Sequence, residues 1–296
     1  MKRVCNRKVM IDALTVCFEV GNRYHYDHLI KLGVGEIYDL YEFRLCRIEG
    51  RYYDNVYTIA YDVEGQNVEF GQLKFGLSRG IAEANLHTSG NPKVWITLNN
   101  SILYNSDRHN LDFIATKLGL EVHNVTAIDL CLDTPFNISK RLKQLIRDKE
   151  YTTILNGKKI VDRDADRPEI SYTLSGSLNK DKYMTVNVKQ RNAIKDKTKG
   201  ITVITYDKKG EIENSSNKSY IMEYYGNPNK LYRTEVHLNN AEFREYIENR
   251  DIQFNVYMMD EAILEAMFFH HLNSVIRFKR GKYNIQWEHL LGRMSA

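Results

Sequence analysis

Apolar and polar residues alternate along much of this chain. In residues 11–20 the apolar side chains Leu14, Val16 and Phe18 occupy every second position, as they do on one face of a β-strand. Three aromatic-rich alternating runs follow, and Gly-containing turns separate them, which predicts an antiparallel meander. These three runs cover residues 37–50, 51–65 and 68–77. Further strands are predicted within residues 93–100, 124–136, 151–161, 169–177, 183–190, 200–209 and 230–240.

Helical spacing occurs at several places in the chain, beginning with a short stretch at residues 26–33 that ends at Gly33. Residues 107–120 carry apolar side chains three and four positions apart and end near Gly119. A basic helix is predicted over residues 138–150, with Asn137 as its N-cap. The last 55 or so residues also read as mainly helical, with a short amphipathic end around Trp287.

This order of elements predicts an α+β fold. We expect a large, curved, mostly antiparallel sheet built of two similar halves, with helices packed on one side and a helical C-terminus. Parallel βαβ wrapping is disfavoured because most strand pairs are joined by short turns. No linker rich in Pro, Ser or Gly separates the halves, so residues 10–240 are predicted to form one domain and residues 241–296 a helical extension packed on it.

The charge of the chain is only mildly basic, but the basic residues cluster. The 296 residues include 42 Lys and Arg against 38 Asp and Glu, a net charge of +4. Residues 179–209 hold nine Lys and Arg against three Asp, so this stretch is a candidate phosphate track, with a solvated hairpin as the alternative. The candidate DNA-binding residues are Lys180, Lys182, Lys189, Arg191, Lys195, Lys197 and Lys199.

Several classes of protein are disfavoured by the sequence. The four cysteines show no CxxC spacing, which argues against a zinc knuckle or a disulfide scaffold. The first 18 residues lack a continuous apolar region and no run approaches 18 apolar residues, so export and membrane spanning are not expected. We therefore expect a cytoplasmic protein.

Three predicted strands each place ionisable side chains on one face, because positions two and four apart share a face. Carboxylates among apolar neighbours are costly to bury unpaired, and a hard divalent cation such as Mg²⁺ or Mn²⁺ would offset that cost. Salt bridges from Asp129 or Glu235 to Arg233 are the alternative. The three sets are Asp129 with Asp133, Tyr206 with Lys208, and Arg233 with Glu235 and His237.

These residues resemble the replication initiators of small rolling-circle plasmids, the Rep_trans family, which also includes initiators of some filamentous phages and relaxases of some conjugative elements. The opening strand IDALTVCF, the strand AIDLCLDT, and VITYDKK followed by LYRTEVHL each match a motif of that family, and LSGS has a counterpart too. The resemblance covers about residues 10–240. Two positions depart from it, because Ala127 replaces a usual arginine and Thr97 a frequent glutamate.

The resemblance implies that residues 10–240 nick one DNA strand at an origin and that Tyr206 is the nucleophile. Attack by Tyr206 would form a 5′-phosphotyrosine link and free a 3′-hydroxyl primer. Lys208 would stabilise the phenolate or the phosphate, and Arg233 would clamp a phosphate oxygen. Asp129, Asp133 and Glu235 would hold Mg²⁺ or Mn²⁺.

The partners implied are an origin hairpin or single strand of DNA, a host helicase because no P-loop occurs, and a second copy of the chain. Two other functions stay open. A relaxase of a mobilisable or conjugative element would use the same chemistry at a transfer origin. Such relaxases often carry an N-terminal helix-turn-helix, whereas this chain begins almost at its first strand, which favours replication. A non-catalytic nucleic-acid-binding sheet protein would bind strands without cutting them.

Overall fold

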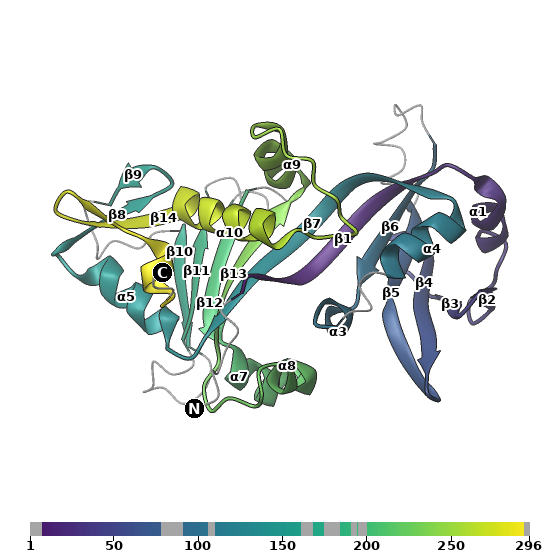
Figure 1. The fold of residues 1–296 in the computed structure, drawn as a ribbon, viewed down its shortest axis with the longest axis horizontal. Coiled ribbons are helices and arrows are strands. Elements are labelled where there is room, and N and C mark those ends of the chain that lie inside the picture. Colours follow the sequence, from purple (N-terminus) through teal and green to yellow (C-terminus); the bar gives the residue numbers. More distant parts are fainter. Residues whose placement is uncertain are drawn as a thin grey trace. The chain divides into compact units, whose positions relative to one another are not determined.

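The computed structural model divides the chain into two compact units (Figure 1). The first unit comprises Met1–Asp12, Ile128–Asn255 and Met259–Ala296, and the second comprises Ala13–Ala127 and Val256–Met258. The structure describes residues 8–77, 91–105, 110–160, 168–174, 184–190, 194 and 200–292.

Eleven of the described strands form one large antiparallel sheet. Hydrogen-bonded neighbours follow the order β10-β11-β12-β13-β7-β1-β6-β5-β4-β3-β2. The strands are β1 (Met10–Val20), β2 (Ile37–Leu40), β3 (Phe43–Ile48), β4 (Tyr53–Val63), β5 (Gln66–Leu77), β6 (Lys93–Leu98), β7 (Leu120–Thr134), β10 (Ile170–Leu174), β11 (Met184–Lys189), β12 (Thr202–Asp207) and β13 (Tyr232–Asn239). The predicted α+β class with a large antiparallel sheet is confirmed.

The second unit contains the aromatic-rich meander that alternation predicts, from β2 to β6. Strands β4 and β5 are joined by Glu64 and Gly65, whose φ angles of 52° and 81° suit a two-residue hairpin loop. Fully buried aromatic side chains make much of the core of this unit, namely Phe18, Phe43, Tyr57, Phe70 and Phe75. Its helices are α1 (Arg23–Leu29), α3 (Asn100–Leu103) and α4 (Asn110–Leu118).

The first unit contains strands β10–β13 and most of the remaining helices. These helices are α5 (Ile138–Arg147), α7 (Lys208–Glu211), the π-helical turn Ile212–Ser216, α8 (Ser219–Tyr224), α9 (Asn240–Glu248), α10 (Glu261–Val275) and α11 (Trp287–Leu290). Helix α5 packs on β11, β12 and β13, and α10 contacts β12 and β13. The Asn137 side chain accepts a hydrogen bond from the Lys140 amide, so the predicted N-cap of α5 is confirmed.

The C-terminal region is helical only in part. Strands β14 (Ile276–Arg280) and β15 (Tyr283–Ile285) form a hairpin that joins β8 (Tyr151–Leu155) and β9 (Lys158–Lys159) in a separate four-stranded sheet. The predicted C-terminal helices are confirmed by α9, α10 and α11. Strands β14 and β15 were not predicted within this mainly helical region, although Ile276 and Phe278 of β14 are buried at alternate positions. Residues 259–296 share a compact unit with residues 128–255, and no boundary between units falls at residue 240.

The described part of the chain contains no helix that is both long and apolar enough to cross a membrane. Among the described residues, Cys17, Cys46 and Cys131 are free thiols.

Candidate active site

Strands β12 and β13 bring Tyr206 and Glu235 to the same face of the sheet. Their antiparallel register pairs Tyr206 with Arg233 and Ile204 with Glu235, so these four side chains lie on one face of the two strands. The opposite face is covered by α5, where the Ser139 and Thr205 hydroxyls lie 3.0 Å apart. Tyr206 therefore lies on the face of the sheet away from α5.

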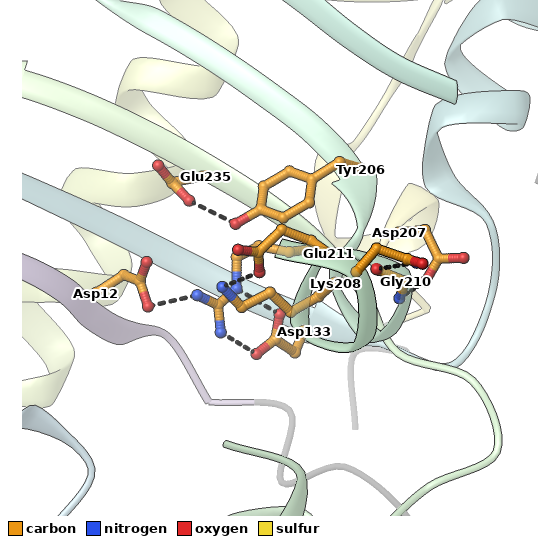
Figure 2. Close-up of polar contacts among 10 residues, drawn as sticks. Asp12, Asp133, Tyr206, Asp207, Lys208, Gly210, Glu211 and Glu235 are labelled. Carbon is orange, nitrogen blue, oxygen red and sulfur yellow. Dashed lines mark hydrogen bonds and ion pairs between the residues drawn. The ribbon is translucent and has the colours of Figure 1, made fainter. Parts of the chain in front are cut away.

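The Tyr206 hydroxyl donates a hydrogen bond to Glu235 Oε2 across 3.1 Å (Figure 2). The pKa of Glu235 is raised to about 7, and burial is the main cause. The negative charges of Asp12 and Asp129 raise this pKa further, whereas the positive charge of Arg233 lowers it by less than Asp12 raises it. Burial also raises the pKa of Tyr206 well above its ordinary value. The pair thus joins a neutral phenol to a carboxyl group that changes its charge near neutral pH.

Arg233 connects this pair to two further strands. Its side chain is fully buried, and its Nε and Nη2 donate to the two oxygens of Asp133 on β7 over 2.8 and 2.6 Å. Its Nη1 forms an ion pair with Asp12 on β1 (Figure 2). Because each nitrogen of the guanidinium group binds a carboxylate, Arg233 is held in place as a fixed charge. The predicted ion pairing of Arg233 is present, but its partners are Asp133 and Asp12.

Lys208 lies beside the tyrosine, although strand β12 ends one residue earlier. Asp207 caps α7 by accepting a hydrogen bond from the Gly210 amide over 2.9 Å, and Lys208 is the first residue of that helix. The buried Lys208 ammonium forms an ion pair with Glu211 over 2.9 Å. It also lies 5.6 Å from the centroid of the Tyr206 ring, within the range of a cation–π contact.

The three predicted metal ligands do not converge on one point. Asp133 is bound through both oxygens to Arg233, and Glu235 accepts from Tyr206. Asp129 forms an ion pair with His237, and this hydrogen bond raises the pKa of the histidine. Among the described residues, no group of three or more His, Cys, Asp or Glu side chains is arranged to hold a metal ion. The side chains as placed therefore do not fit the predicted three-carboxylate metal site.

Most of the predicted DNA-binding residues, and Ser175–Ser177 of the LSGS element, lie outside the described part of the chain. Lys189 is described, at the end of β11, where it is half-buried. The departure at Thr97 falls in the second compact unit, where its hydroxyl lies 3.0 Å from that of Thr15. The predicted Lys and Arg residues that are not described are Lys180, Lys182, Arg191, Lys195, Lys197 and Lys199.

Asp12 was not among the residues that the sequence singled out for chemistry. It is the one acidic residue near the start of an apolar strand, between Ile11 and Ala13, and its side chain is only 12% exposed. A carboxylate in such a position needs a partner. That requirement could have pointed to an ion pair, although not to Arg233 as the partner.

No protein-family model and no curated protein matches this sequence. Among solved structures, the chain is similar to the rolling circle replication initiator protein from Geobacillus stearothermophilus, with a TM-score of 0.49 and 13% sequence identity over 96% of this chain and 95% of that one. An identity of 13% says nothing about which side chains the two proteins share, so the function is inferred from the site itself.

Proposed function

We propose that this protein cuts one strand of DNA by transesterification at Tyr206. The tyrosine oxygen attacks a phosphodiester in line, the bond from phosphorus to the 3′-oxygen breaks, and the 5′-phosphate becomes joined to the tyrosine. The released 3′-oxygen takes up a proton and becomes a primer end. The observation that supports this function best is the hydrogen bond from the Tyr206 hydroxyl to Glu235, close to the buried Arg233–Asp133 ion pair and to Asp12.

Glu235 is the proton acceptor in this proposal. A tyrosine of ordinary pKa is roughly 0.1% ionised at pH 7, which costs about 4 kcal/mol, and burial of Tyr206 raises that cost further. A base in hydrogen-bond contact removes the need for a free phenolate, and 3.1 Å is within reach for direct transfer. A carboxylate with a pKa of about 7 is also matched to proton transfer near neutral pH.

The cations around the tyrosine have separate roles. Arg233 positions the site, because its three contacts tie β13 to β7 and β1 and fix the strand that carries Glu235. We therefore replace the phosphate clamp predicted for Arg233 by a positioning role. Lys208 supplies positive charge next to the Tyr206 ring, which favours negative charge on the phenol oxygen or on an incoming phosphate.

The biological reaction proposed for this chemistry is the start of rolling-circle replication. Its substrate would be an origin hairpin or single strand, unwinding would depend on a host helicase, and the protein would act in the cytoplasm, with a second copy as a further proposed partner. We retain a requirement for Mg²⁺ or Mn²⁺ as a prediction. Asp129 remains the candidate ligand, because Asp133 is already engaged through both oxygens and Glu235 is the proposed proton acceptor. A relaxase would share the chemistry and differ in the DNA that it cuts.

A nicking assay tests the proposal. The full chain is incubated with supercoiled plasmid carrying the DNA that flanks its own gene, and relaxed product and covalent protein–DNA adduct are measured. We expect Tyr206→Phe to bind this DNA but leave it uncut and form no adduct. Tyr283→Phe, at an exposed tyrosine on β15, should cut normally. Binding without cutting by the unaltered chain would instead favour the non-catalytic function, and cutting only at transfer-origin DNA would favour a relaxase.

A further inference from the structure

Helix α5 presents a basic surface that the proposed cutting reaction does not use. Its apolar side is buried, whereas Lys140, Arg141 and Arg147 are exposed. Together with Lys143 they line a hollow of about 760 Å³ that extends to Tyr151 at the start of β8. The buried apolar side chains on the other side of the helix are Ile138, Leu142, Leu145 and Ile146.

Within the described part of the chain, the three exposed cations of α5 are poorly neutralised by acidic side chains. Among the described residues that line the hollow, Asp148 is the one acidic side chain, and no ion pair joins Lys140, Arg141 or Arg147 to another described residue. By contrast, the exposed Arg244 and Arg280 each bind a glutamate. The charges of these three α5 side chains therefore remain available to a partner.

The positions of these charges lower the stability of helix α5 when no partner is bound. The first turn of α5 contains no acidic residue and does contain Lys140, which is the unfavourable sign at a helix N-terminus. Lys143 lies three residues after Lys140 and four before Arg147, and like charges at such spacings destabilise a helix by roughly 0.2–0.5 kcal/mol per pair. A polyanion bound along this face would relieve both effects.

The position of α5 relative to Tyr206 indicates that this polyanion would be DNA. The helix begins beside β12, where Ser139 contacts Thr205, the residue next to the tyrosine. From Lys140 to Arg147 the helix rises about 10 Å, the length of roughly three nucleotide steps of a DNA strand. Because α5 covers the opposite face of the sheet, its charges would meet DNA that flanks the cut and not the cut phosphate.

We propose that the exposed face of α5 binds the sugar-phosphate backbone of DNA flanking the cleavage site, without reading its sequence. This inference rests on the proposed function. It predicts that the surface contributes affinity and salt dependence, while the rate of cutting at saturating DNA comes from Tyr206 and its neighbours.

The test compares two full-length triple variants that remove the same charge. Lys140→Gln/Arg141→Gln/Arg147→Gln removes the α5 cations, and glutamine keeps the helix propensity. Lys31→Gln/Arg44→Gln/Arg51→Gln is the matched control, at exposed positions of the second compact unit. Affinity for a duplex with a single-stranded tail is measured by fluorescence anisotropy across a range of salt concentrations, for sequences that are and are not cut.

We expect the α5 variant to bind both sequences at least tenfold more weakly at low salt. The slope of log affinity against log salt should become shallower by about 0.9 for each phosphate that the variant no longer neutralises, or by roughly 2 to 3 in total. Its melting temperature should stay level or rise, because like-charge repulsion is removed. Cutting at saturating DNA should be unchanged.

Equal DNA affinity and equal salt slope in the two variants would overturn the inference. It would also be overturned if the α5 variant bound anionic vesicles or polyglutamate more weakly than the control variant but bound DNA equally well. These results are distinct from failure of the proposed function. If the unaltered chain cuts through Tyr206 and only the α5 comparison fails, then cutting stands without this surface. If the unaltered chain neither binds nor cuts DNA, both proposals fail.

Discussion

Replacing Glu235 by glutamine separates the proposed proton transfer from packing. Glutamine has nearly the same shape and can still accept the hydrogen bond from the Tyr206 hydroxyl, but it cannot take up its proton. If Glu235 is the proton acceptor, the rate of cutting at saturating DNA should fall by about 10²–10⁴, the usual contribution of general base catalysis. DNA affinity should change little, because the neighbouring cations remain.

The same substitution has a predictable effect on stability. Burial raises the pKa of Glu235 from 4.5 to about 7 in the folded state, so between these pH values the folded protein binds more protons than the unfolded chain. Stability is therefore lost as the pH rises from about 4.5 through 7. At about 1.4 kcal/mol for each tenfold change in a protonation equilibrium, the loss is about 3 kcal/mol at pH 8. Glu235→Gln should abolish it.

Two measurements check this reasoning. Single-turnover nicking from pH 5 to 9 should show a rise with a midpoint near pH 7 in the unaltered chain, and that rise should be absent from the variant. Urea unfolding should find the variant more stable than the unaltered chain at pH 8 by about 3 kcal/mol, with no such gain at pH 4. A variant that cuts at the normal rate, or a stability gain equal at both pH values, would refute the role of Glu235.

Three further predictions concern the rest of the site and the fold. Arg233→Met should lower the free energy of unfolding by about 3–5 kcal/mol, because it leaves the Asp133 carboxylate buried without its ionic partner. Adding Asp133→Asn to this variant should recover part of that loss, which a double-mutant cycle measures. Burial lowers the pKa of His271 to about 3, with smaller effects of His270 and Arg250. The free energy of unfolding should therefore fall by roughly 5 kcal/mol as the pH drops from 6.5 to 3. Acid unfolding of the His271→Leu variant should lack most of that fall. EDTA should abolish nicking, and Mg²⁺ or Mn²⁺ should restore it; nicking unaffected by EDTA would remove Asp129 as a metal ligand.

Alternation along the strands was enough to predict which side chains share a face. The pattern placed Arg233 with Glu235 on one strand and Tyr206 on another, and the register of β12 against β13 brings these faces together. It could not predict which carboxylate each cation binds. Asp133 and Asp12 are separated from Arg233 by 100 and 221 residues, and their pairing depends on the order of strands in the sheet.

Periodicity also could not predict which element carries Lys208. A strand continued through Lys208 would place it beside Tyr206 by alternation alone. The chain instead turns into α7 at Asp207, whose carboxylate caps the helix, and Lys208 reaches the ring from the first helical turn. At β14 a strand was missed where helix was expected. The helical pattern continues up to residue 276, and the strand that follows is short, with only Ile276 and Phe278 as buried alternating positions.

The most direct test of the central proposal is to identify the residue that becomes joined to DNA. After cutting, the adduct is digested with trypsin and nuclease, and the peptide that carries the remaining nucleotide is sequenced by mass spectrometry. Cleavage after Lys199 and Lys208 yields residues 200–208, in which Tyr206 is the single tyrosine. We predict that the nucleotide is attached to Tyr206 in that peptide. A nucleotide on any other peptide, such as residues 219–230 with Tyr220, would contradict the assignment of Tyr206 as the nucleophile.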